Sequence, residues 1–386
     1  MRGIFLFLGG VVSLFSQTSG VITGAVYDPT GEPVSGAGVS ATLVETGLER
    51  ATRTDDDGRY VLPLLPPGSY RLRAAADNLQ PAARSGLALS VAETLRVDFH
   101  LQLGPVETEM TVTGEPPLVN TETSELSYLV EEGVIRELPL NGRNYTDLAL
   151  LQPGIVAFPN RDGGSIVAHG LGVSINGQDP RSNVYLIDGT PQNDFTNGPA
   201  GSAASTALGA ETIREFRVET NAYGAEFGRS FGGQITALTK SGTNEFHGSA
   251  FHFHRNDNLD ARNFFDREEP PEFRRNQFGG TLGGPIAGSR TFFFAGYEGL
   301  REDKGRTMNT VTPNAAVRLG PVNPAVKPYL DEFPIPNGRE LGSGLAEYIF
   351  FFNEEISQDF VQGRIDHIFS PGHQFFTRYT LDDARQ

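Results

Sequence analysis

Histidine and cysteine are the residues best suited to metal and nucleophile chemistry, and the chain has seven of the first and none of the second. Without cysteine there is no disulfide framework, no thiolate metal site and no cysteine nucleophile. No histidine begins the H-x-x-E or H-E-x-x-H patterns of zinc enzymes. His252 and His254 share one face of a predicted strand, but two ligands make a weak metal site. We therefore expect no metal and no cofactor. The histidines are His100, His169, His247, His252, His254, His367 and His373.

Three further motifs could carry chemistry, and none has the surroundings that the chemistry needs. Residues 228–232 fit G-x-S-x-G, but a nucleophile elbow needs a helix after it, and a strand is predicted there. The glycines of residues 279–284 lack the lysine and helix of a phosphate loop. The acidic run at residues 55–58 lacks the closing glutamate of a calcium loop, so a hairpin turn is the better interpretation. The sequence thus predicts no catalytic residue and no enzyme.

Length and composition indicate the broad class of protein. A chain of 386 residues is too long for one core and suggests two or three domains. A net charge of -16 argues against a nucleic-acid partner, because phosphate binding needs a basic face. The 46 glycines and 27 phenylalanines, without tryptophan, favour strands and tight turns over long helices.

Residues 1–19 have the order of a secretory signal peptide. Arg2 precedes an apolar run at residues 4–15, and small and polar residues follow it. A membrane anchor is the alternative, but this run is too short to span a bilayer as a helix. No later segment reaches about 18 consecutive apolar residues. We expect an exported chain that is soluble, attached to a surface, or a β-barrel.

Residues 20–103 have the short alternating runs and turn signals of a small β-sandwich. Their motifs, G-x-V-x-D-x-x-G-x-P-V-x-G-A-x-V, T-D-x-D-G-x-Y and P-G-x-Y-x-L, resemble the carboxypeptidase regulatory-like domain. The resemblance implies a transthyretin- or starch-binding-like sandwich that serves as a scaffold, sometimes contacts carbohydrate and has no catalytic role. The residues that carry it are Gly24, Val26, Asp28, Gly31, Pro33, Val34, Gly36, Ala37, Val39, Thr54, Asp55, Asp57, Gly58, Tyr60, Pro67, Gly68, Tyr70 and Leu72.

Residues 104–119 are rich in Thr, Glu and Pro and read as an extended linker. Within it, one Thr- and Val-rich segment is a strand without an evident partner, suited to pairing with the edge of another protein. From the residues alone, we favour the interpretation that this segment is the last strand of the sandwich, followed by a tether. The segment consists of Glu107, Thr108, Glu109, Met110, Thr111, Val112 and Thr113.

Residues 120–244 have a mixed α/β pattern. Helical spacing predicts helices over residues 125–137, 145–151 and 207–214, the second of them behind Asn144 as N-cap. Strands are predicted at residues 174–176, at 184–187, which end in the turn Asp188-Gly189, and at 215–220. A strand over 234–240, a turn at Ser241-Gly242 and a strand over 246–255 follow.

Three stretches of this region, residues 137–154, 174–189 and 213–249, resemble the plug domain of TonB-dependent receptors. More narrowly they are similar to the Oar-like subgroup, in which a carboxypeptidase regulatory-like domain precedes the plug. The continuation, at residues 251–265, 273–286 and 290–302, resembles the first strands of that family's barrel. The resemblance implies that the segment from Glu107 to Thr113 is the TonB box, which pairs as a strand with TonB.

Residues 245–386 alternate as membrane barrel strands do, with Val361 and Ile365 on one face and Gln362, Arg364 and Asp366 on the other. On this interpretation His252 and His254 line the lumen. The pattern predicts five strands, whereas plugged outer-membrane transporters close at about 22. Because an open barrel edge in lipid leaves backbone groups unpaired, we expect a fragment or a truncated reading frame.

The predicted fold is multidomain and mainly β: an N-terminal β-sandwich, an α+β plug and the first antiparallel strands of an incomplete transmembrane barrel. The resemblance implies an outer-membrane receptor, its sandwich and linker periplasmic, that takes up a small-molecule, glycan or peptide substrate. Its partners would be outer-membrane lipid and TonB with its inner-membrane energising complex. The alternative is a secreted or cell-surface carbohydrate-binding or adhesive protein without transport.

Overall fold

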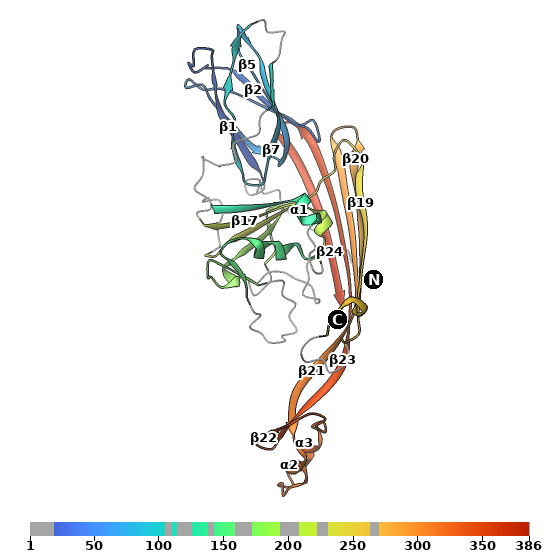
Figure 1. The fold of residues 1–386 in the computed structure, drawn as a ribbon. Coiled ribbons are helices and arrows are strands. Elements are labelled where there is room, and N and C mark those ends of the chain that lie inside the picture. Colours follow the sequence, from blue (N-terminus) through green and yellow to red (C-terminus); the bar gives the residue numbers. More distant parts are fainter. Residues whose placement is uncertain are drawn as a thin grey trace. The chain divides into compact units, whose positions relative to one another are not determined.

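The computed structural model is built mainly of strands, as the sequence predicts (Figure 1). It describes residues 19–104, 110–113, 126–137, 143–158, 172–193, 208–221, 231–262 and 270–385. The predicted signal peptide therefore lies, apart from Ser19, outside the described residues. None of the helices in these ranges is long and apolar enough to cross a membrane. The chain divides into two compact units: Met1–Ser249 with Gly280–Tyr297 and Phe360–Asp382, and Ala250–Gly279 with Glu298–Asp359 and Asp383–Gln386.

The first domain is a β-sandwich, which confirms the prediction. One sheet has the order β4-β1-β8, with β9 also paired to β1, and the other has the order β11-β7-β5-β2-β3. Alternate residues of β5 are buried, and Tyr70 and Leu72 pack in the core. Asp55 closes a hairpin turn by accepting the N–H groups of Asp57 and Arg59. The strands are β1 (Gly20–Tyr27), β2 (Gly38–Leu43), β3 (Glu49–Arg53), β4 (Arg59–Leu65), β5 (Gly68–Ala75), β6 (Leu79–Gln80), β7 (Ala82–Leu89), β8 (Thr94–Arg96), β9 (Phe99–His100), β10 (Gln102–Leu103) and β11 (Met110–Thr113).

The region after the sandwich contains a five-stranded sheet, called here the plug sheet, with the order β12-β17-β18-β15-β16. Its neighbours are antiparallel except for β15 and β18, which run parallel. Phe216, Val218 and Ile175 are fully buried in its core. The elements of this region are β12 (Leu126–Glu131), α1 (Glu132–Glu137), the 3-10 helix η2 (Tyr145–Leu151), β13 (Ile155–Ala157), β14 (Val173–Ile175), η3 (Pro180–Ser182), β15 (Val184–Ile187), β16 (Thr190–Pro191), η4 (Ala210–Thr212), β17 (Ile213–Asn221) and β18 (Gln234–Thr239).

Two of the three helix predictions in this region are wrong in extent. The helix expected over residues 125–137 begins only at Glu132, because Leu126–Glu131 pairs with β17 and the ladder satisfies its backbone groups. In place of a helix over residues 207–214, residues 208–214 hold the short η4 and the start of β17. The helix at Tyr145–Leu151 is confirmed in the 3-10 form, with Asn144 accepting the N–H of Thr146 as N-cap.

The last part of the chain forms a sheet, called here the wall sheet, with the order β19-β20-β21-β23-β22 and with β24 also paired to β23. Arg274 contacts Asp303 and Gln277 contacts Glu298, so numbers rise along β20 as they fall along β21, and these two strands are antiparallel. The sheet has one strand more than the five predicted, the short β22. Its strands are β19 (His247–Asn256), β20 (Phe273–Ala287), β21 (Thr291–Pro313), β22 (Glu340–Gly342), β23 (Leu345–Ser370) and β24 (His373–Arg385).

The strands predicted on either side of Ser241-Gly242 both exist, but they lie in different sheets. β18 belongs to the plug sheet and β19 to the wall sheet. The connection is therefore a crossing from one sheet to the other. Gly242 permits it: a Cβ there would lie 2.3 Å from the carbonyl oxygen of Phe293 and 2.7 Å from that of Gly284.

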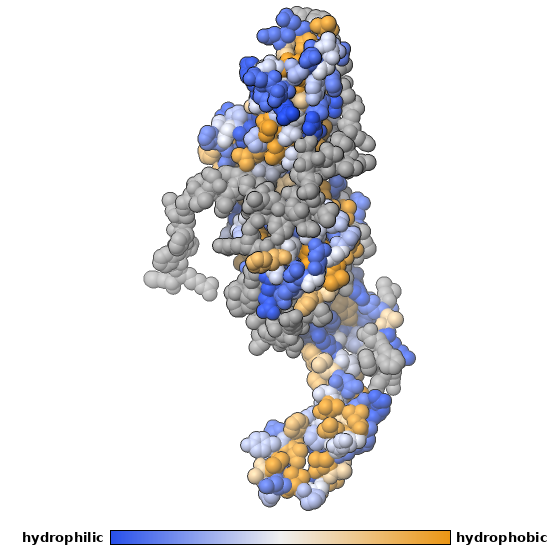
Figure 2. All heavy atoms as spheres, turned by 90° about the vertical axis from the view of Figure 1, so that its left-hand side faces the viewer, coloured by the Kyte–Doolittle hydropathy of each residue, from blue (hydrophilic) through white to orange (hydrophobic). Residues whose placement is uncertain are grey.

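Between β21 and β23 the chain forms α2 (Ala315–Leu319), α3 (Lys327–Asp331) and β22. Arg318 ties this segment together by donating to the carbonyl oxygens of Leu330, Phe333 and Pro334. Apolar side chains gather on its surface in Figure 2, and Leu319, Ile335 and Tyr329 are among the most exposed.

Candidate functional site

A buried negative charge stands at the turn between β15 and β16. Asp188 and Gly189 both have positive φ, at 48° and 76°, which an Asp-Gly pair adopts at little cost. The Asp188 carboxylate accepts the N–H of Thr239 at 2.9 Å and its hydroxyl at 2.7 Å. Its side chain is only 2% exposed. The predicted turn therefore fixes a charge in the protein interior.

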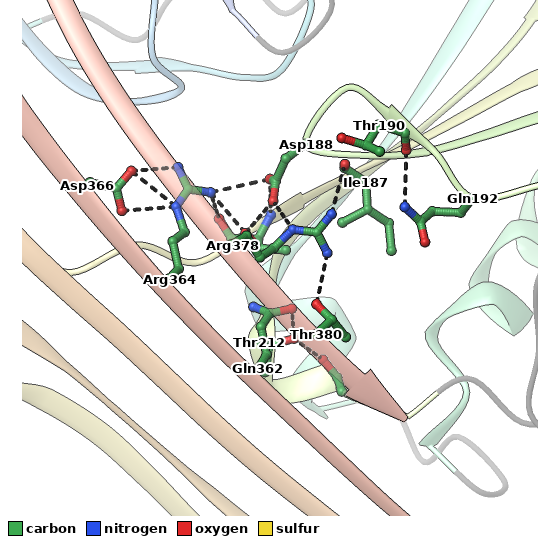
Figure 3. Close-up of polar contacts among 12 residues, drawn as sticks. Ile187, Asp188, Thr190, Gln192, Thr212, Gln362, Arg364, Asp366, Arg378 and Thr380 are labelled. Atoms are coloured by element: carbon green, nitrogen blue, oxygen red, sulfur yellow. Dashed lines mark hydrogen bonds and ion pairs between the residues drawn. The ribbon is translucent and has the colours of Figure 1, made fainter. Parts of the chain in front are cut away.

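Two arginines of the wall sheet approach this carboxylate (Figure 3). Nη1 of Arg364, on β23, lies 3.3 Å from Oδ1 of Asp188, and Nε of Arg378, on β24, lies 3.0 Å from Oδ2. Both arginine side chains are largely shielded from solvent, at 11% and 12% exposed. Arg378 also donates to the carbonyl oxygen of Ile187. Since buried charges are tolerated only when they are paired, this contact joins plug sheet and wall sheet by matched ions.

Asp366 balances the second positive charge. Its carboxylate accepts from Nη2 of Arg364 at 2.8 Å and from Nε at 3.0 Å, and the guanidinium lies 4.6 Å from the ring centre of Phe376. Two aspartates and two arginines have no net formal charge. Asp188, Thr239, Arg364, Asp366 and Arg378 are called here the Asp188 cluster.

A second polar contact between the plug region and the wall sheet lies at Glu211, in η4. Nη2 of Arg143 is 2.6 Å from Oε1 of Glu211, and both side chains are buried. The hydroxyl of Ser249, on β19, donates to Oε2 of Glu211 at 3.2 Å. Beside it, a Cβ on Gly296 would lie 2.5 Å from the Thr212 methyl group, so glycine permits a close approach here.

Sequence reasoning found the parts of the Asp188 cluster but not the cluster itself. It predicted Asp188-Gly189 as a turn and placed Arg364 and Asp366 on one strand face. The missing information is the contact between Asp188 and Arg364, which are 176 positions apart. The alternating pattern of the strand does place an arginine on the inner face. It does not predict which carboxylate pairs with that arginine.

The candidate TonB box is described in part. Met110–Thr113 forms β11, whereas Glu107, Thr108 and Glu109 lie outside the described residues. β11 runs parallel to β7, in a register from Met110 opposite Ala82 to Thr113 opposite Ser85. The segment is extended, as expected, and its role stays a prediction.

The two histidines that share a strand face in the sequence both lie on β19. His252 and His254 are exposed, and Nδ1 of His254 lies 2.9 Å from Oδ1 of Asn276. Throughout the described ranges, no three His, Cys, Asp or Glu side chains are grouped so that they could hold a metal ion.

Glu215, on β17, is a buried carboxyl group with a shifted pKa. Burial raises the pKa of its carboxyl to about 7, an effect that the neighbouring Arg214 partly offsets. The carboxylate accepts the N–H of Val91 from the sandwich. Arg214 lies 3.5 Å from Glu45, also in the sandwich. These contacts link the first domain to the plug sheet.

Comparisons with known proteins agree with this arrangement. Residues 21–102 match the family model of the carboxypeptidase regulatory-like domain, and residues 238–323 match that of an outer membrane beta barrel domain. A curated relative, the TonB-dependent transporter Oar of Myxococcus xanthus, is 32% identical over 314 residues, which cover 77% of this chain and 28% of the relative. The chain thus spans less than a third of that relative's length.

Two solved receptor structures resemble the chain at low identity. The siderophore receptor PirA of Acinetobacter baumannii is 17% identical with a TM-score of 0.40, over 66% of this chain and 32% of its own. A mutant of the ferric enterobactin receptor PfeA of Pseudomonas aeruginosa is 14% identical with a TM-score of 0.41, over 65% and 32%. Scores of this size do not establish a shared fold.

The curated relative and the two family matches together identify the class of TonB-dependent receptors. The chain belongs to this class of outer-membrane proteins. Within it, the chain is Oar-like, as the relative and the N-terminal family match together indicate.

Proposed function

We propose that this protein is a transporter that takes up a substrate across the outer membrane with energy delivered by TonB. The Asp188 cluster is the observation that supports it most strongly. In that cluster, a carboxylate of the plug region is paired with two arginines of the barrel-type strands. Such an interface can be opened, because its charged groups regain hydration when they part.

In this mechanism the plug region is the moving part. TonB pairs with the segment from Glu107 to Thr113, and tension along the linker reaches the plug sheet. The contacts of Asp188 with Arg364 and Arg378 then break, and the plug region opens a path beside the wall. Outer-membrane lipid contacts the other side of the wall, where Val361 and Ile365 are exposed.

The substrate is a small molecule, a glycan or a peptide, and no described residue distinguishes among these. The curated relative from Myxococcus xanthus is named as a transporter, which supports a transport role. A carbohydrate contact of the sandwich stays a prediction.

A proline substitution tests the assignment of the TonB box. Val112→Pro removes a main-chain donor from β11 and prevents strand pairing there. We expect it to weaken binding of the purified C-terminal domain of TonB by roughly tenfold or more, the loss of one or two hydrogen bonds. Val119→Pro changes the same residue type in the same linker outside the box and should leave binding within about twofold. Equal effects of the two substitutions would contradict the assignment.

A further inference from the structure

β11 is not an isolated segment but the end strand of a sheet. It is the first strand in the order β11-β7-β5-β2-β3, paired along one side with β7 over four residues. A strand has two hydrogen-bonding edges, and pairing with β7 uses one of them. Within the described residues, the other edge of β11 ends the sandwich sheet.

The strand that pairs with β11, β7, is anchored in the sandwich core. Ala82, Leu87 and Leu89 of β7 belong to the sandwich core. The last pair among the described residues is Thr113 opposite Ser85, and Gly86, the next residue of β7, has a φ of +77°. There the register between β5 and β7 also shifts, which is the mark of a β-bulge. The four residues of β7 that pair with β11 therefore lie on one side of this bulge.

The sequence of β11 lacks the devices that normally protect an end strand. Proteins blunt such edges with charged residues, proline or bulges. β11 reads Met-Thr-Val-Thr, with no charge, proline or glycine, and three of its residues are β-branched types that favour strands. Its outer edge is therefore suited to receive another extended segment.

We propose that the energising partner adds its strand to the outer edge of β11 while β11 remains paired with β7. The partner becomes a new end strand of the sandwich sheet, and the sandwich acts as a template. This inference depends on the proposed function, which assigns β11 to the TonB box. The sandwich contributes by holding β11 extended in advance, so that the partner orders only its own strand on binding.

A reversible cross-link tests whether β11 has to leave β7. Val112 lies opposite Arg84, and the chain has no cysteine, so Arg84→Cys with Val112→Cys creates a single defined pair. Neighbouring strands bring paired Cα atoms within disulfide range. The probe is the purified C-terminal domain of TonB, and its affinity is measured for the same receptor sample before and after reduction.

We expect the oxidised receptor to bind the probe at least as tightly as the reduced one. Loss of binding on oxidation, restored by reduction, would overturn the template and mean that β11 must be released. Each single cysteine variant controls for the substitutions. A second pair, Ser85→Cys with Thr113→Cys, is used if the reduced first pair no longer binds. If the unmodified receptor does not bind the probe, the box assignment is itself wrong, an outcome distinct from loss on oxidation alone.

Discussion

At the scale of single residues, Asp188 is a plug-region side chain that pairs with two arginines of the wall sheet. Its carboxylate contacts two arginines and accepts from the N–H and the hydroxyl of Thr239, and its side chain is nearly inaccessible. Asp188 stabilises the fold by more than its preference for the turn, because removing its carboxylate would leave two guanidinium groups in the interior with fewer partners.

Asp188→Asn removes that charge and keeps the turn, since asparagine also tolerates a positive φ. We expect a loss of about 3 kcal/mol in the free energy of unfolding, as when one partner of a buried ion pair is removed. Unfolding of the receptor in detergent micelles measures it. Asp331→Asn, at an exposed pair with Lys327, should cost less than about 0.5 kcal/mol. A loss no larger at Asp188 than at Asp331 would refute the role of the cluster.

Glu215 makes stability depend on pH. The folded state keeps its carboxyl protonated up to a pKa of about 7, whereas the ordinary value is 4.5. Between these values the folded state binds the additional proton, so stability falls as pH rises from about 4.5 to 7 and stays lower above that.

Glu215→Gln removes this dependence and can still accept the N–H of Val91. The variant should be more stable than the parent at pH 8, by at most about 3 kcal/mol, and equal to it near pH 4. Thermal unfolding at the two pH values checks this, with the exposed Glu49→Gln as control. A difference that is the same at both pH values would show that the Glu215 charge is not the cause.

At the scale of elements, the decisive feature is the crossing at Gly242 from β18 of the plug sheet to β19 of the wall sheet. Gly242→Ala places a methyl group against two backbone carbonyls, which cannot move aside as a side chain would. We expect a loss of about 1–3 kcal/mol in unfolding free energy. Gly363→Ala, on β23 with open space around its Cβ position, is the matched control. Similar losses at the two glycines would contradict close packing at the crossing.

In the plug and wall sheets, the sequence predicts where strands lie better than it predicts which strands pair. Alternation on β23 identifies Val361 and Ile365 as outward residues and Gln362 as an inward one, which the exposures confirm. On β21, Phe292 and Phe294 are buried, and Phe294 lies near His247 and Gly283, contacts that no local pattern predicts. Leu126–Glu131 was predicted as helix because helical spacing is local, whereas its pairing with β17 is a tertiary contact.

At the scale of the whole molecule, the chain combines three regions with different tasks. The sandwich presents β11, the plug sheet carries the buried charge, and the wall sheet meets it with arginines. No local sequence pattern could predict that Asp188 pairs with Arg364 and Arg378 of another region, because this pairing is a tertiary contact that exists only in the folded chain. The account depends on the wall having lipid on one side and the plug region on the other.

Accessibility of spin labels on β23 tests that claim most directly. Single cysteines replace Val361 and Ile365, which are 40% and 45% exposed, and Gln362, which is 2% exposed. With the receptor in lipid vesicles, labels at positions 361 and 365 should collide with dissolved oxygen and be shielded from a water-soluble nickel complex, while position 362 is shielded from both. Labels at 361 and 365 that collide freely with the nickel complex would place this face in water and contradict the account.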